Sequence, residues 1–552
     1  MSSYIKFPGS KYEVGKQNYN IQLPCLVQTT MAGETSSGIT EDPKLDQERI
    51  KSVMDAKENV KRPPRPKIQK AIFVLRDRED YQKYYEPRVV SFGPIHHGGE
   101  KYMLGEKYKL VMTNEFVNGS AEKISDLYKK VGEKITELRD CYEEEVNKKF
   151  KDDKALAWLL LVDGCAILQY IYCAVNTASP ADPARADENK FEVLNIKPDS
   201  VAFTQQDLFL LENQLPYCLL KWLMRWSGNE FELKKSIEKY IEGLVRVPEP
   251  EDPSLILSCA WLSSLSWNWS KPSEKKEGRQ SSIIGCACLS LLSWCFSQRR
   301  KQRQEETKLQ ESGQLSIPMD ENEDPIHLLD LLRTQLLCKH QQIKPKKPNG
   351  EKMETWQSYR NVQELRAAGI HVERSKRKNS CLREISFSKL CCLGYLWLPP
   401  ITVDDSTRPK FLNLMAYESC LDFKNDFGIT SYVSFLDSLI DEANDVKMLR
   451  KAGILYNCLG SDEEVAQVFN EIGTDLVPNS KIYGNIRFQI QKHYENNFMT
   501  LLAQFYHDHF SSPWTFMAFV GALLALVLTI IQTKYAVNSP PGPCDNFCKI
   551  FT

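Results

Sequence analysis

The sequence of 552 residues predicts a mainly α-helical fold with a few short β-strands, organised as a single large irregular helical domain plus one C-terminal transmembrane helix. Three observations support this fold class. Apolar residues recur at spacings of three and four over long stretches, as in amphipathic helices. Strand-like runs are few and at most four residues long. Finally, residues 514–531 are 18 residues without a charge, which as a helix would span ~27 Å, close to the thickness of a membrane's hydrocarbon core.

Composition divides the chain into four regions. Residues 1–66 are polar, poorly patterned and end in a proline-rich linker, so we predict a disordered N-terminal segment in which only Pro43–Lys61 has helical character. The other predicted regions are the body at 67–512, interrupted by a variable insertion at about 250–323, the transmembrane helix at 513–535, and a short tail at 536–552.

The first half of the body is predicted to be helical. Ser120–Phe150 has the strongest amphipathic pattern, with Ser120 as the N-cap. Ala155–Val175 is apolar on almost all sides, which predicts a helix buried in the body, because Asp163 within it would be costly in a membrane. Pro216 should interrupt the helical segment Asp207–Trp226. A short strand at 89–90 and a helix at 230–244 complete this half.

The second half is predicted to mix helices with short strands. Asp324-Pro325 has the residue types of a helix start, and Gly369 has the type that ends one, here the helix Val362–Ala368. Ser461 and Glu464 have the spacing of a capping box. The remaining predictions are strands at 384–387, 395–398 and 401–403, and helices at 411–421, 431–443, 445–451 and 482–510.

Charge and cysteine usage exclude some classes of function. Lys+Arg (71) balance Asp+Glu (72), unlike the strongly basic composition of many nucleic-acid-binding proteins. The 17 cysteines are scattered without Cys-x-x-Cys spacing, so we expect reduced, mostly buried thiols and neither metal nor cofactor. A basic run at 299–303 follows the apolar segment 283–296 within the insertion, and this pair leaves a lipid-surface scaffold as one alternative function.

Few residues suggest catalysis. The sequence contains no phosphate-binding loop, His-Glu-x-x-His motif or Gly-x-Ser-x-Gly elbow. His96 and His97 stand in a turn rich in glycine and proline, and the polar triplet 212–214 precedes Pro216. We interpret both as structural, a turn and a hydrogen-bonded helix end. The alternative is a membrane-associated enzyme with a pocket around His96, His97 and Glu212, which requires these side chains to meet.

Several segments, in order along the chain, carry a family resemblance. Residues 85–98 read YEPRVVSFGPIHHG, residues 211–216 read LENQLP, and HLLDLLR, ELRAAGI and NLMAYE follow at 327–333, 364–370 and 413–418. Over residues 68–535 the chain resembles the plant family called domain of unknown function 247. The motif residues to which we assign a structural or partner-binding role are Pro87, Ser91, Gly93, Pro94, His96, His97, Gly98, Glu212, Asn213, Gln214 and Pro216.

The resemblance implies a plant protein with a C-terminal transmembrane helix and no established enzymatic activity. We therefore expect a membrane-anchored, non-enzymatic recognition or signalling protein, in a self/non-self process resembling self-incompatibility or in stress. Its partners would be membrane lipid, through one span, and another protein, but not nucleic acid. Because residues 1–20 contain no apolar secretory signal, we expect a tail anchor with a cytosolic body. The residues representing the span are Trp514, Phe519, Gly521, Leu524, Leu528 and Ile531.

Overall fold

The computed structural model describes residues 43–59, 65–177, 190–247, 324–338, 361–375, 381–390, 393–495 and 513–537. The chain separates into two compact units, Met1–Arg62 and Pro63–Thr552. Four predicted features lie wholly or mostly outside the described residues. They are the N-terminal segment apart from 43–59 and 65–66, the insertion at about 250–323 with its basic run at 299–303, the C-terminal part of the helix predicted at 482–510, and most of the tail.

The first unit contributes one described helix, α1 (Pro43–Asn59). This helix agrees with the helical character expected of Pro43–Lys61. The side chains of Ile50, Val53 and Met54 are all exposed, so these three apolar residues of α1 bury nothing. A helix of this kind depends on its own backbone hydrogen bonds and local propensity rather than on packing.

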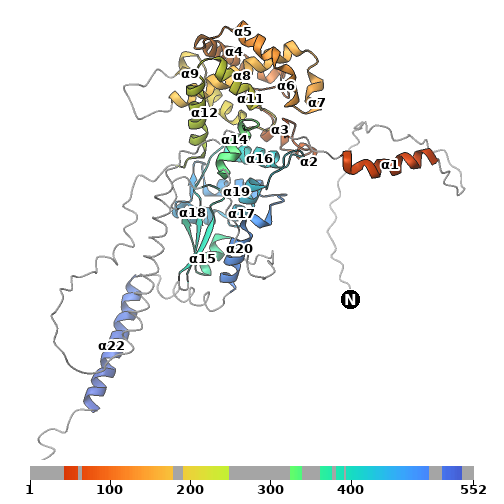
Figure 1. Ribbon diagram of the computed structural model, residues 1–552. Helices are drawn as coiled ribbons and strands as arrows, with labels where there is room; N and C mark the ends of the chain where they lie inside the picture. The colour runs from red at the N-terminus through yellow and green to blue at the C-terminus, as the bar shows by residue number, and fades with distance from the viewer. Residues whose placement is uncertain are drawn as a thin grey trace, which may run out of the picture. The chain divides into compact units, whose positions relative to one another are not determined.

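The second unit begins with a helical part that is organised around α8 (Asp153–Thr177). The helices α4 (Met103–Asn118), α5 (Ile124–Glu133), α11 (Tyr217–Trp226) and α12 (Glu230–Val245) all pack against α8 (Figure 1). This arrangement confirms the prediction that the apolar segment 155–175 is a buried helix. The shorter elements here are α2 (Phe73–Arg76), α3 (Tyr81–Tyr85), η1 (Glu100–Tyr102), α6 (Ile135–Asp140), α7 (Glu144–Lys149), α9 (Lys190–Val193) and α10 (Pro198–Asp207).

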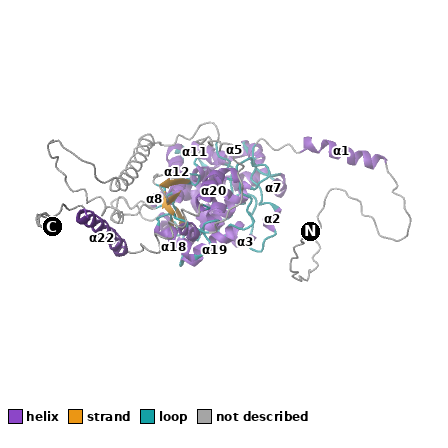
Figure 2. Cartoon of the chain, turned by 90° about the horizontal axis from the view of Figure 1, so that it is seen from below, coloured by secondary structure: helices purple, strands orange, loops and turns teal. Residues whose placement is uncertain are grey.

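The second part of this unit combines helices with five short strands, a small share of the described chain (Figure 2). In the larger sheet, β3 (Leu393–Leu398) lies between β1 (Ile370–Arg374), to which it is parallel, and β2 (Ser386–Leu390), to which it is antiparallel. In the smaller sheet, β4 (Ile401–Val403) pairs in parallel with β5 (Leu455–Asn457). The fold is thus mainly helical with a few short strands, as predicted, although β1 and β5 were not among the predicted strands.

Helices accompany these strands. They are α14 (Leu328–Leu337), α15 (Val362–Ala367), α16 (Thr407–Glu418), α17 (Gly428–Asp437), α18 (Ala443–Lys451), α19 (Asp462–Ile472) and α20 (Ser480–Tyr494). The α15–β1 connection passes through Gly369, whose φ of +77° confirms the predicted left-handed helix end. Helix α20 packs on β2, and α17 contacts both α19 and α20.

The prediction of one helix over Ser120–Phe150 is wrong, because this segment forms α5, α6 and α7. The second break occurs where the backbone pairs with a residue far away in the sequence. Ile68 donates its N–H to the Cys141 carbonyl at 2.8 Å and accepts the N–H of Glu143 at 3.0 Å, and Tyr142 between them is fully buried. Ser120 is not the N-cap either, since α5 begins at Ile124.

Two further boundaries differ from the predictions. Helix α14 begins at Leu328 rather than at Asp324-Pro325, and its N-cap is His327, whose Nδ1 accepts the N–H of Asp330 at 3.1 Å. The prediction that Pro216 interrupts a helix is wrong, because α10 already ends at Asp207, residues 208–216 are turn and loop, and Pro216 is the N-cap of α11 (Tyr217–Trp226).

The apolar C-terminal segment forms α22 (Pro513–Val537). Two helices in the described chain are long and apolar enough to cross a membrane, Asp153–Asn176 in α8 and Met517–Val537 in α22. They differ in burial, because 72% of the α8 window is buried within the fold and none of the α22 window is. A long apolar helix that buries nothing within its own chain is the membrane-span candidate here.

Candidate functional site

The hallmark turn, residues 86–98, is held in place by the carboxylate of Asp207 at the end of α10. The backbone N–H groups of Arg88, Val89 and Val90 all donate to this carboxylate, at 2.8, 2.8 and 2.9 Å. The predicted strand at 89–90 is therefore wrong, because a side chain from a distant helix occupies the donors that a strand would use. Burial raises the pKa of Asp207, although these three N–H groups oppose the shift.

Asn213 and Gly93 lock the next part of the turn. The Asn213 Oδ1 accepts the N–H of Phe92 at 2.6 Å, and its Nδ2 donates to the Val90 carbonyl at 3.1 Å. Gly93 has a φ of +70°, and a Cβ there would lie 3.0 Å from the Gln214 carbonyl. Only glycine fits this position without strain, because the backbone is both left-handed and closely approached.

A buried ion pair lies directly beneath the turn. The Lys109 Nζ on α4 lies 2.6 Å from Asp163 Oδ1 on α8, and their side chains are 2% and 0% exposed. The second oxygen of Asp163 accepts the N–H of Gly93 at 2.7 Å, while Lys109 also donates to the Ser91 carbonyl at 2.8 Å. Burial lowers the pKa of Lys109, but the nearby carboxylates of Asp163 and Glu106 outweigh burial and raise it.

The structure brings His96 and Glu212 together. The His96 Nε2 lies 3.0 Å from Glu212 Oε2, with the two side chains 15% and 1% exposed. The other carboxylate oxygen accepts the N–H of Ala71 at 2.8 Å and the hydroxyl of Tyr81. Burial alone would raise the pKa of Glu212, but its contacts with His96, Tyr81 and Ala71 lower it overall. Glu212 is thus an ionised, buried carboxylate that orients the imidazole of His96.

His97 does not join this pair. Its ring lies 5.7 Å from that of Phe150, centroid to centroid. Its backbone carbonyl accepts a hydrogen bond from Lys149 at 3.1 Å, and the same amine reaches the Ile95 carbonyl at 2.9 Å. Of the three side chains named in the alternative pocket, the structure thus brings His96 and Glu212 together, whereas His97 contacts Phe150 with its ring and Lys149 with its backbone carbonyl.

Gln214 connects the helical part to the rest of the body. Its Nε2 donates to the Leu208 and Leu210 carbonyls at 2.8 Å each, and its Oε1 accepts the N–H of Leu329 on α14 at 3.1 Å. Asn413 on α16 makes a parallel connection, because its Oδ1 accepts the N–H of Leu211 at 2.8 Å. The polar triplet 212–214 is therefore buried and hydrogen-bonded as expected, but it lies in the loop after α10 and not at a helix end.

Sequence reasoning missed the partners in this network. The sequence marks Asp207 only as the start of a predicted helical segment, and nothing in it singles out Lys109 or Tyr81. A lysine on a helix is usually a solvated residue, so nothing local distinguishes Lys109. The buried acid Asp163 was the available signal, because a buried carboxylate requires a donor somewhere in the fold.

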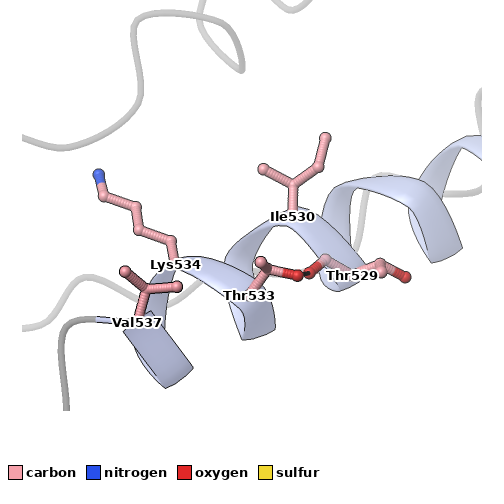
Figure 3. Close-up of a pocket in the computed structure, with 5 residues that line it drawn as sticks. All are labelled: Thr529, Ile530, Thr533, Lys534 and Val537. Carbon is pink, nitrogen blue, oxygen red and sulfur yellow. Dashed lines mark hydrogen bonds between the residues drawn. The ribbon is translucent and has the colours of Figure 1, made fainter.

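No group of three His, Cys, Asp or Glu side chains suited to a metal ion occurs among the residues that the structure describes. An open surface depression of about 390 Å³ lies on the C-terminal turns of α22 and is lined by Thr529, Ile530, Thr533, Lys534 and Val537 (Figure 3). One face of a single helix forms all of it, so it lacks the opposing wall that a ligand-binding cavity needs.

The predicted span residues share one environment. Trp514, Phe519, Leu524, Leu528 and Ile531 are all exposed on α22. A Cβ added at the sixth, Gly521, would meet nothing within 4 Å.

Comparisons with known proteins agree with the resemblance seen in the motifs. The profile of a family described as plant protein of unknown function, domain of unknown function 247, matches residues 68–528. UPF0481 protein At3g47200 of Arabidopsis thaliana is 24% identical over 478 residues, which cover 83% of each chain. A UPF0481 protein of the same plant, At3g02645, is 24% identical over 173 residues, or 31% of this chain and 32% of its own. No solved structure matches. Because the family profile matches most of its length, this chain belongs to the plant family domain of unknown function 247.

Proposed function

We propose that this protein is a membrane-anchored, non-enzymatic recognition protein that binds another protein through an exposed apolar stripe on α4. The stripe consists of Met103, Leu104, Leu110 and Val111, which are 62, 51, 55 and 37% exposed. At 100° per residue these four positions fall within one third of the helix circumference. A signalling role in self/non-self discrimination or stress is the process that we propose from the family resemblance.

The opposite face of α4 explains why the stripe is unusual. Gly105, Lys109, Met112, Thr113 and Phe116 are buried on that side, where α4 packs against α8. A helix at the surface of a soluble protein normally carries polar residues on its outer face. Here the outer face exposes four large apolar side chains beside the exposed polar residues Lys107 and Asn114, and exposed apolar side chains grouped on one helix face are typical of a binding surface.

The hallmark residues support a scaffold role rather than chemistry. Asp207, Asn213 and Gln214 direct their hydrogen bonds to backbone groups, and Asp163 is held by Lys109 and Gly93. Side chains engaged in this way position the turn and α4. The proposed anchor is α22, since none of its membrane-length window is buried within the chain.

Proximity labelling of the full-length protein in native plant tissue tests this proposal. The double variant Met103→Glu/Leu110→Glu should lose the reproducible protein neighbours of the wild type, because the two charges would remain unpaired in an apolar interface. Phe231→Glu on α12 is the matched control, since Phe231 is 73% exposed but lies outside the stripe. An unchanged set of neighbours in the double variant would contradict the proposed surface.

A second candidate function is an enzyme that uses His96 as a general acid or base. The observation that favours it is the 3.0 Å contact between His96 and Glu212, because a carboxylate that orients an imidazole is a recurring catalytic arrangement. The contact occupies Nε2 and leaves Nδ1 to exchange a proton with a ligand. Turnover on a panel of ester and phosphoester substrates that is lost in His96→Ala but kept in His97→Ala would favour this candidate over the first.

A further inference from the structure

Two features of the body, a disulfide and an exposed glycosylation sequon, are both typical of the secretory pathway. We propose that the body lies on the exoplasmic side of the membrane, where Cys338–Cys381 persists as a disulfide and Asn118 carries an N-linked glycan. This replaces the expectation of a cytosolic body with reduced cysteines. The proposal rests on the proposed function in one respect, the use of α22 as the membrane anchor.

The disulfide between Cys338 and Cys381 joins segments that other contacts already hold side by side. Their Cα atoms are 5.6 Å apart, within the ordinary range for a disulfide. Next to the bond, Leu382 donates its N–H to the Leu336 carbonyl at 3.0 Å. Its own carbonyl accepts the hydroxyl of Tyr483 at 2.9 Å. The fold therefore places both sulfur atoms in bonding position without help from the bond itself.

The oxidation needs a disulfide donor of the kind found in the secretory pathway. The thiolate of one cysteine attacks a small-molecule disulfide and releases one small thiol, and the second cysteine thiolate then displaces another from the mixed disulfide. Two protein thiols and one small disulfide thus yield one protein disulfide and two small thiols. Cys338 and Cys381 are both half-buried, so small thiols reach them, and the reducing cytosol would favour the reverse reaction.

The sequon Asn118-Gly119-Ser120 is placed where a glycan would be tolerated. Asn118 is exposed and is the last residue of α4. Its side chain makes no hydrogen bond within the part of the chain that the structure describes. The neighbouring backbone is fixed, because the Gly119 carbonyl accepts the Asn229 Nδ2 at 2.7 Å. A glycan on Asn118 would therefore project into solvent without disturbing the fold.

The charges around α22 agree with this orientation. Lys534 lies in the last turn of α22 and Lys549 follows in the tail, whereas residues 496–513 contain neither lysine nor arginine. Because positively charged residues near a span tend to remain in the cytosol, this asymmetry favours a cytosolic tail and an exoplasmic body.

Sealed plant microsomes that contain the full-length protein provide the test. The background variant Asn268→Gln removes the second sequon, Asn268-Trp269-Ser270. In that background we expect the body to resist added protease, and amidase removal of N-glycans to increase the gel mobility of the protein by one glycan. Asn118→Gln should abolish the mobility change. Asn114→Gln, an exposed asparagine of the same helix outside any sequon, should keep it.

Mass spectrometry of alkylated cysteines supplies the second measurement. We expect Cys381 to resist alkylation before reduction in the wild type, to react in Cys338→Ala, and to remain resistant in Cys458→Ala, which removes an exposed free thiol. Digestion of the body in sealed microsomes, with no glycan and a freely alkylated Cys381, would overturn the proposal. Carbonate extraction distinguishes failure of the anchor from failure of the orientation. Release of the protein from the membrane would refute the α22 anchor, whereas retention with a digested body would refute only the exoplasmic orientation.

Discussion

The buried pair Lys109–Asp163 leads to the most direct test of the scaffold beneath the hallmark turn. Replacing Lys109 with Met keeps the volume of the side chain but leaves Asp163, which is 0% exposed, without its cationic partner. Removing one member of a buried pair typically costs 3–5 kcal/mol. Asp163 retains the N–H of Gly93 at 2.7 Å, so we expect about 3 kcal/mol, at the lower end of this range.

A double-mutant cycle separates the pair from the rest of the packing. We expect Lys109→Met and Asp163→Asn each to destabilise the fold by about 3 kcal/mol and the double variant by clearly less than their sum, because neither charge then remains unpaired. The matched control is the surface pair Lys148–Glu144, whose side chains are 73% and 84% exposed. Its single variants should cost about 0.5 kcal/mol or less, because solvent screens the charges.

Urea-dependent pulse proteolysis of the full-length protein in detergent measures these differences, since it reports the fraction of unfolded body. The reasoning would be refuted if Lys109→Met lowered the free energy of unfolding by less than about 1 kcal/mol. It would also be refuted if the effects of the two single variants added up in the double variant. Either result would mean that water reaches the pair and screens it.

Two more predictions concern single residues. Burial lowers the pKa of His327 to about 3, and its Nδ1 must stay unprotonated to accept the N–H of Asp330. As the pH falls, the unfolded chain therefore binds this proton before the folded chain does, and the free energy of unfolding should fall by about 2 kcal/mol between pH 8 and pH 5. Urea titrations at a series of pH values measure this dependence. His327→Asn, which keeps a capping acceptor, should remove the part of the pH dependence that comes from His327. Gly93→Ala should cost more than Gly98→Ala in the same assay, because both positions have positive φ but only Gly93 faces a backbone oxygen, that of Gln214. Equal losses would show that strain alone, without the close approach, determines the cost.

Several elements could be predicted because their signal is local. Gly369, for example, ends a helix through its own φ of +77°. The apolar segments at 155–175 and 514–531 follow from composition alone. Asp163 distinguishes the first segment, as a buried helix, from the second, as a membrane span, because a carboxylate away from water needs a partner that a protein interior can supply.

The failures share a different cause. Ser120–Phe150 has a helical pattern throughout, yet Ile68 pairs with the backbone at 141–143 and interrupts it. Val89–Val90 has the residue types of a strand, yet Asp207 takes the N–H groups that a strand would use. In both cases a partner that is distant in sequence competes for backbone hydrogen bonds, and no local propensity reveals such a partner.

The sequence by itself determined the helical character, the apolar C-terminal helix, the family membership and the set of hallmark polar residues, because each depends on residue type and spacing along the chain. The tertiary structure alone decided that Lys109 pairs with Asp163, that Glu212 holds His96 but not His97, and that Cys338 meets Cys381. In each pair the two residues lie 43 to 116 positions apart in the sequence. Their contact therefore depends on how the chain packs and not on any local pattern.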